Sequence, residues 1–121
     1  TPDGSSSFHL PRAIGIKKTL EMTLLGNRYA AQDMANMGLV NFVVPSEQLD
    51  SECEKLTNRL ASGPTFVHGR AKKLMYRSLE NEFEAQLQLE GEYFSECAAR
   101  QDFREGVGAF VEKRKANFTG T

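Results

Sequence analysis

The 121-residue chain contains no tryptophan, only two cysteines and almost no net charge. Cys53 and Cys97 form neither a CxxC motif nor a Cys/His spacing, which argues against a zinc motif or a disulfide framework and favours a reducing compartment. The 15 Lys and Arg residues are balanced by 16 Asp and Glu residues, so no strong positive field is available to hold nucleic acid. Apolar runs such as 38–44 fall far short of the roughly 18 to 20 residues that span a bilayer. We therefore expect no nucleic-acid partner and no membrane contact.

Motifs that carry cofactor or metal chemistry are also missing. The chain has no phosphate-binding loop, no Rossmann glycine fingerprint and no HExxH. His9 and His68 lie far apart in the sequence, without paired carboxylates at ligand spacing, and are interpreted as ordinary structural or surface histidines. From pattern alone we expect no metal site and no resident cofactor.

What is present indicates a helical globule. Apolar residues make up 40% of the chain and charged residues 26%, as in ordinary globular domains. The start at Thr1-Pro2, without Met, predicts a piece of a longer protein. Apolar residues recur at spacings of three and four between glycines and prolines, which predicts six or seven helices.

The helices have expected limits. Ser5 starts a short helix that Pro11 limits to a turn or two. Further helices are expected between Gly15 and Gly26, around 34–37, and over 46–62 and 64–79. Two capping boxes, Asn81 with Glu84 and Asp102 with Glu105, predict the starts of the last two helices. The apolar, β-branched segment 39–44 is the one plausible strand.

Five segments, taken in order, resemble the crotonase superfamily, the enoyl-CoA hydratases and enoyl-CoA isomerases. Residues 2–12 are similar to the family's active-site turn and following helix. Residues 25–33 and 38–45 resemble its "LTG-R-SA-EA" and "GLV--V-P" segments. Ala71-Lys72, together with the DFREG and AFVEKRK stretches of 102–115, resemble its closing signature.

The resemblance implies a mostly α fold, the carboxy-terminal helical part of the ClpP/crotonase-like fold, with at most one short strand. Residues 1–45 would form the end of the crotonase core, with the active-site turn, short helices and short strand. Residues 46–121 would form a helical oligomerisation and lid region. The amino-terminal β-spiral half, absent here, would carry both amide donors of the oxyanion hole, so we expect the isolated chain to be inactive.

Asp3 is the candidate catalytic residue that the resemblance implies. Hydratases of the family generally have Gly at this turn position, whereas several isomerase branches carry there the carboxylate that moves the proton, so Asp3 favours an enoyl-CoA isomerase. An enoyl-CoA hydratase, or a dehalogenase that uses this Asp as a nucleophile, are the alternatives. Without the resemblance, Pro2-Asp3-Gly4 is an ordinary β-turn.

The resemblance further implies that Phe110 and Lys113 contact the acyl-CoA of a neighbouring subunit, with the ammonium near a nucleotide phosphate. Core packing of Phe110 and a solvated cationic helix end are the alternatives. The implied partners are an acyl-CoA substrate, whose coenzyme A is part of the substrate rather than a cofactor, and further copies in a homo-oligomer, a trimer or dimer of trimers. The implied location is cytoplasmic, or mitochondrial or peroxisomal in a eukaryote.

Two alternatives come from other functional classes. The chain could act only as an association module, because its apolar helix faces have no evident partner within 121 residues. A helix-turn-helix DNA-binding domain is the weaker alternative. The helix expected over 64–79 is basic, but the rest of the chain neutralises it and no base-reading side chains accompany it.

Overall fold

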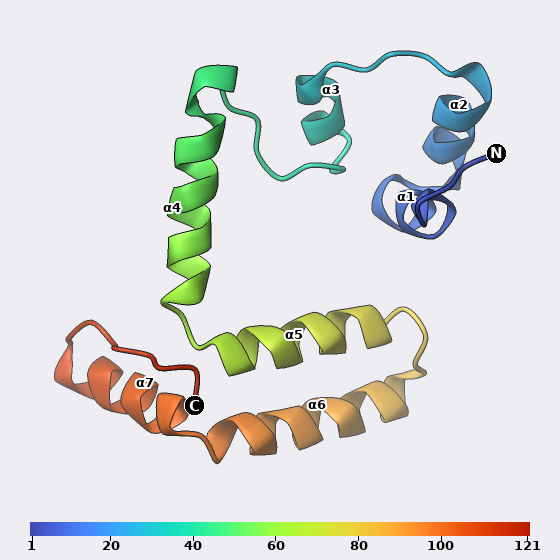
Figure 1. Cartoon of the computed structure of the whole chain (residues 1–121). Coiled ribbons are helices and arrows are strands. Elements are labelled where there is room, and N and C mark those ends of the chain that lie inside the picture. The colour runs from blue at the N-terminus through green and yellow to red at the C-terminus, as the bar shows by residue number, and fades with distance from the viewer. The chain divides into compact units, whose positions relative to one another are not determined.

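The computed structural model describes residues 1–121 and contains seven α-helices and one 3₁₀-helix, with no strand (Figure 1). The mostly helical fold class expected from the sequence is therefore confirmed. The chain divides into two compact units, Thr1–Leu49 and Asp50–Thr121, which are described separately. No helix combines the length and the apolar character that crossing a membrane requires.

The first unit contains α1 (Ser6–Ile14), α2 (Ile16–Leu25), α3 (Ala31–Asn36) and the 3₁₀-helix η1 (Ser46–Gln48). α1 packs against α2, and Gly15, with a φ of 77°, makes the corner between them. The buried Thr19 holds this corner because its Oγ1 donates a hydrogen bond to the Gly15 carbonyl at 2.9 Å.

Pro11 does not stop α1, contrary to the expectation from the sequence. The helix passes through Pro11 and ends at Ile14, nine residues long. Proline cannot donate to the preceding turn, but its fixed φ of about −65° is itself helical. Its carbonyl still accepts a hydrogen bond from the Gly15 amide at 3.0 Å, so the second half of the helix is retained.

The strand expected over 39–44 is also wrong. After α3, Gly38 takes a φ of 82° and the Leu39 amide bonds back to the Met34 carbonyl at 2.9 Å, which closes the helix end. The following residues have no β-ladder partner anywhere in the chain. A β-branched apolar sequence forms a strand only when another strand satisfies its amides and carbonyls.

The second unit contains α5 (Thr65–Arg77), α6 (Phe83–Ala98), α7 (Gln101–Glu112) and nearly all of α4 (Leu49–Ala61). α5 and α6 run antiparallel side by side (Figure 1). Arg70 joins them: its guanidinium pairs with Glu96 and lies 4.8 Å from the Phe66 ring centroid and 5.1 Å from that of Tyr93. Such cation–π contacts need little burial to be favourable.

Neither expected capping box forms. The first turn of α6 has no side-chain cap; Asn81 instead donates to the Gln86 side chain at 3.0 Å, one helical turn further on. α7 begins at Gln101, so Asp102 and Glu105 lie inside the helix rather than at its cap. Both carboxylates bind the C-terminal segment, residues 114–121, instead.

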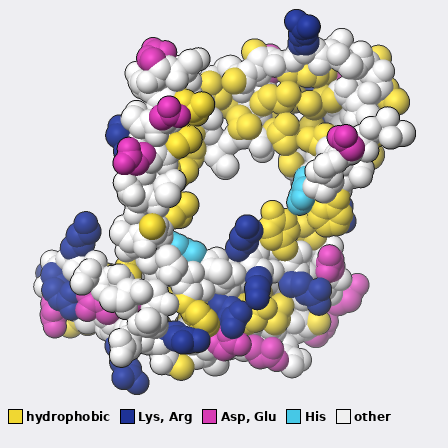
Figure 2. Space-filling view, viewed as in Figure 1, with side chains coloured by type: hydrophobic (Ala, Val, Ile, Leu, Met, Phe, Trp, Pro, Cys, Tyr) yellow, Lys and Arg dark blue, Asp and Glu magenta, His cyan; other side chains and the backbone are white.

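Most apolar side chains remain uncovered within the 121 residues. Thr19, Asp102 and Ala109 are the only buried residues, and hydrophobic side chains lie on the surface of both units (Figure 2). The chain exposes 9575 Å², whereas two separate compact globules of these sizes would expose about 7,800 Å². Packing inside the chain thus leaves several helix faces free to contact something else.

Two glycines have open space around them, so a change to alanine at each position tests the backbone without steric clash. One position tests a left-handed conformation and the other tests helix propensity. Gly26, with a φ of 62°, ends α2, whereas Gly69 lies in the middle of α5. Gly26→Ala should lower the free energy of unfolding by about 1–2 kcal/mol because alanine is strained in the left-handed region. Gly69→Ala should raise it by about 0.5–1 kcal/mol.

Urea unfolding followed by circular dichroism measures both changes. The same substitution must give opposite signs at the two positions. Stabilisation by Gly26→Ala would contradict the left-handed end that we describe for α2.

Candidate functional site

The predicted catalytic residue, Asp3, lies in a tight turn immediately before α1. Its carbonyl accepts hydrogen bonds from the Ser6 amide at 2.9 Å and the Ser6 hydroxyl at 2.6 Å. Gly4 and Ser5, with φ of 54° and 65°, complete the turn. The Asp3 side chain is exposed and receives no hydrogen bond from the rest of the chain. The turn thus fixes the backbone of Asp3 while leaving its carboxylate available.

Left-handed backbone marks both predicted sites. Ser5 and Lys113 are the only non-glycine residues with positive φ, at 65° and 53°. Ser5 lies two residues from Asp3, and Lys113 is itself a predicted substrate contact. A β-carbon in this region costs roughly 1–2 kcal/mol, and such outliers gather at functional sites.

Phe110 and Lys113 lie together at the end of α7, in the second unit, and Asp3 belongs to the first. The Phe110 side chain is 84% exposed, so it is not part of a core within this chain. Lys113 ends the helix, and its amide donates to the Phe110 carbonyl at 3.3 Å. None of the ion pairs in the structure includes the Lys113 ammonium. The aromatic ring and the cation are both available to a ligand.

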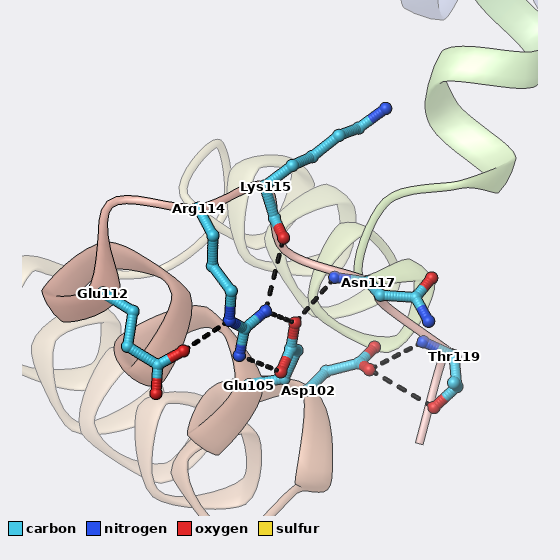
Figure 3. Close-up of polar contacts among 7 residues, drawn as sticks. All are labelled: Asp102, Glu105, Glu112, Arg114, Lys115, Asn117 and Thr119. Carbon is cyan, nitrogen blue, oxygen red and sulfur yellow. Dashed lines mark hydrogen bonds and ion pairs between the residues drawn. The ribbon is translucent and has the colours of Figure 1, made fainter.

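Arg114 organises the carboxylates that surround this helix end (Figure 3). Its guanidinium binds both oxygens of Glu105, at 2.6 and 2.9 Å, and its Nε donates to Glu112 at 2.5 Å. Glu105 also accepts the Asn117 amide at 2.8 Å. This two-pronged arginine–carboxylate geometry is stronger and more directional than a single contact.

The hydrogen bonds of Glu105 shift its acidity. Those from the Arg114 guanidinium, and after them the one from the Asn117 amide, lower the pKa of the Glu105 carboxyl from 4.5 to about 2. Glu105 and Glu112 in turn raise the pKa of Arg114 above its usual range. Both groups therefore stay charged at every pH at which the protein is ordinarily handled.

Asp102 forms the second attachment of the C-terminal segment. Its buried carboxylate accepts the amides of Thr119 and Gly120, each at 2.8 Å, and its own amide donates to the Thr121 carbonyl at 2.9 Å. Asp102 and Glu105 are separated by one helical turn, so the segment runs back along α7 (Figure 3). Sequence reasoning missed this role because the D-x-x-E spacing is also that of a capping box.

The attached segment completes an apolar groove of about 340 Å³. The Phe118 ring covers Gly106, where a β-carbon would lie 3.5 Å from it. The groove is lined by side chains of α5 and the residue before it, of α7 and of the C-terminal segment: Pro64, Val67, Phe103, Val107, Phe110 and Phe118. Phe110 thus lies at the edge of a surface suited to an apolar group.

The first unit has a more polar pocket of about 570 Å³ that includes Lys18, Glu21, Arg28 and Tyr29. Glu21 accepts hydrogen bonds from Lys18 at 2.9 Å and from the Tyr29 hydroxyl at 3.2 Å. These bonds, Lys18 first, lower the pKa of Glu21, and the bond to Glu21 raises the pKa of Lys18. The Glu21 carboxylate is already engaged by both donors, so it is not free to act as a base.

No three His, Cys, Asp or Glu side chains come together in a way that could hold a metal ion. His9 lies edge-on to Phe8, with 5.2 Å between ring centroids. The His68 ring covers Gly63, where an added β-carbon would lie 2.6 Å from Cε1. Both histidines are exposed, and each ring lies against a neighbouring residue of its own unit.

The sequence matches the family model described as "Enoyl-CoA hydratase/isomerase" over residues 1–121. It is 36% identical over 119 residues to the "Probable enoyl-CoA hydratase" of Rhodobacter capsulatus. Over the same length it is 35% identical to the "1,2-epoxyphenylacetyl-CoA isomerase" of Escherichia coli. The alignments cover 98% of this chain, but only 46% and 45% of these two relatives.

The fold agrees with these sequence matches. The structure superimposes on the "Enoyl-CoA Hydrates Subunit I" of Geobacillus kaustophilus with a TM-score of 0.93 and 32% sequence identity. The superposition covers 99% of this chain and 47% of the other. The chain thus spans about half the length of the relatives and structures that it matches.

The acidity of Glu105 gives a direct test of the cluster around Arg114. Because the pKa of Glu105 is depressed in the folded state, its interaction favours folding above about pH 4.5 and is lost as the pH falls toward about 2. Carbon-13 NMR of the side-chain carboxyl should show a midpoint of about 2. Arg114→Gln should move that midpoint toward 4.5.

Arg77→Gln is the matched control, because it breaks an exposed arginine–glutamate pair, with Glu80 at 3.0 Å, elsewhere in the same unit. The Glu105 midpoint should not change in this variant. A midpoint near 4.5 in the unaltered protein would refute the arginine–carboxylate cluster.

Proposed function

Because this chain belongs to the enoyl-CoA hydratase/isomerase family, we propose that it is the helical carboxy-terminal half of an enzyme that isomerises enoyl-CoA thioesters. The resemblance seen in the sequence is confirmed at the level of the family. Asp3 is the proposed proton-transfer residue. The observation that carries the proposal is its exposed carboxylate, unengaged by the chain, in a turn that the Ser6 amide and hydroxyl hold to the start of α1.

One carboxylate suffices for this reaction. Asp3 takes a proton from the α-carbon of a 3-enoyl thioester, and the electron pair of that C–H bond moves into the dienolate, whose oxygen is negatively charged. The protonated Asp3 then returns the proton to the γ-carbon, which leaves the double bond between the α- and β-carbons. Amide donors aimed at the thioester oxygen would stabilise the dienolate, and in this proposal the other half of the enzyme supplies them.

Hydration is the second candidate. It is supported by the hydratase names among the relatives, as for the Rhodobacter capsulatus protein. Addition of water needs a positioned water molecule and a group that activates it, in addition to the proton that reaches the α-carbon. Asp3 alone provides one of these functions, which is why we rank isomerisation first.

We also propose that the whole enzyme is a homo-oligomer, a trimer or a dimer of trimers, in which Phe110 and Lys113 contact the acyl-CoA bound to a neighbouring subunit. The exposed ring of Phe110 and the unpaired ammonium of Lys113 support such a contact. The uncovered apolar faces of the helices support association, since apolar patches of several hundred Å² commonly mark interfaces.

Asp3→Asn in the whole enzyme tests the proton-transfer role. The amide cannot accept the proton, so kcat for conversion of a 3-enoyl-CoA into the conjugated 2-enoyl-CoA should fall by about 10²–10⁴-fold. Absorbance of the conjugated thioester measures the rate. Asp50→Asn, at an exposed aspartate near the start of α4, is the control and should retain full activity.

The products distinguish the two candidate reactions. If the enzyme forms a 3-hydroxyacyl-CoA from a 2-enoyl-CoA and does not isomerise the 3-enoyl-CoA, the proposed activity is wrong and the enzyme is a hydratase. Full isomerase activity in Asp3→Asn would remove Asp3 from the mechanism.

The 121-residue chain by itself should not turn over enoyl-CoA. Loss of one oxyanion-hole donor commonly costs about 10²–10³-fold in rate, and in this proposal both donors lie outside the chain. The purified chain, mixed with a 3-enoyl-CoA, should give the same absorbance trace as buffer. Turnover that rises in proportion to chain concentration would show that these residues carry the complete site.

A further inference from the structure

The cluster around Arg114 leaves one cation conspicuously unpaired. Arg114 binds both Glu105 and Glu112, the two acidic residues closest to the end of α7. Lys113 lies between Glu112 and Arg114 in the sequence, yet none of the ion pairs includes its ammonium. The carboxylates that could have neutralised Lys113 are thus committed to its neighbour.

The same contacts determine the backbone on both sides of Lys113. The Arg114 amide donates to the Ala109 carbonyl at 3.0 Å, and the Arg114 side chain is held by Glu105. The Glu112 side chain is held by Arg114 in turn. Lys113 keeps its φ of 53° between these two fixed residues, in a conformation that normally favours glycine.

Stability can account for the bidentate pair of Arg114 with Glu105, whose side chain is 26% exposed, but not for a lysine at position 113. A glycine at position 113 would end the helix without strain. A lysine therefore occupies a position whose left-handed backbone conformation is unfavourable for a residue with a β-carbon. This points to a use for its ammonium.

We propose that Glu105 is a positioning residue that acts through Arg114 to hold the Lys113 ammonium toward the phosphates of a coenzyme A thioester. The inference rests on the proposed function, which makes Lys113 a substrate contact. Glu105 does not touch the substrate. It holds Arg114 away from Lys113 and fixes the left-handed turn from which the ammonium extends.

Binding of two unreactive ligands by the whole enzyme tests this role. Butanoyl-CoA carries the nucleotide phosphates, and butanoyl-pantetheine carries the same acyl group without the nucleotide. Calorimetry should show that Glu105→Gln raises the dissociation constant of butanoyl-CoA about tenfold, because a charge-assisted contact is lost. The dissociation constant of butanoyl-pantetheine should stay unchanged.

Three further variants complete the design. Lys113→Ala should weaken butanoyl-CoA binding as much as Glu105→Gln does, and the double variant should show no additional loss, because both changes remove one interaction. Glu96→Gln breaks the ion pair with Arg70 elsewhere in the second unit and should leave both ligands unaffected.

The outcomes separate the two proposals. Weaker butanoyl-CoA binding in Lys113→Ala with normal binding in Glu105→Gln overturns the positioning role and leaves the substrate contact intact. Equal weakening of both ligands in Glu105→Gln also overturns it, since that is the result of a general structural defect. Unchanged butanoyl-CoA binding in Lys113→Ala, or no binding by the unaltered enzyme, overturns the substrate contact and the inference together.

Discussion

The hydrogen bonds from the Thr119 and Gly120 amides to the Asp102 carboxylate hold the C-terminal segment along α7. A carboxylate this buried is unfavourable unless donors replace its lost water, and these amides do so. With the end of the segment fixed, Asn117 reaches Glu105 and the Phe118 ring covers Gly106. The apolar groove depends on this attachment. The cluster around Arg114 is formed by the first residue of the same segment.

The helices and their ends are fully formed in this chain, whereas most of its apolar side chains remain exposed. The helix ends are closed by local hydrogen bonds, and the α5–α6 pair and the C-terminal segment are held by contacts between more distant residues of the second unit. The apolar faces of α2, α4 and α6 are largely exposed, with Leu24, Leu60 and Phe94 among their uncovered side chains. Hydrophobic burial normally provides the main driving force of folding. Burial within these 121 residues supplies little of it.

Local sequence predicted the helices well because periodicity and glycine or proline boundaries act over a few residues. α2, α4 and α5 follow from such signals. The errors arose where a contact distant in sequence decided the outcome: 39–44 lacked a strand partner, and Asp102 bound Thr119, 17 residues away, rather than capping its own helix. The family resemblance was also what predicted Asp3, Phe110 and Lys113 as site residues. The contact between Glu105 and Arg114, on which the proposed positioning role rests, was visible only in the structure.

Amide hydrogen exchange in the 121-residue protein tests the attachment of the C-terminal segment most directly. We expect the Thr119 and Gly120 amides to exchange much more slowly than in an unstructured peptide, because both donate to a buried carboxylate. Asp102→Ala should abolish that protection while leaving the amides of α5 and α6 protected. Exchange of Thr119 and Gly120 at unstructured-peptide rates in the unaltered protein would contradict the attachment of this segment to α7.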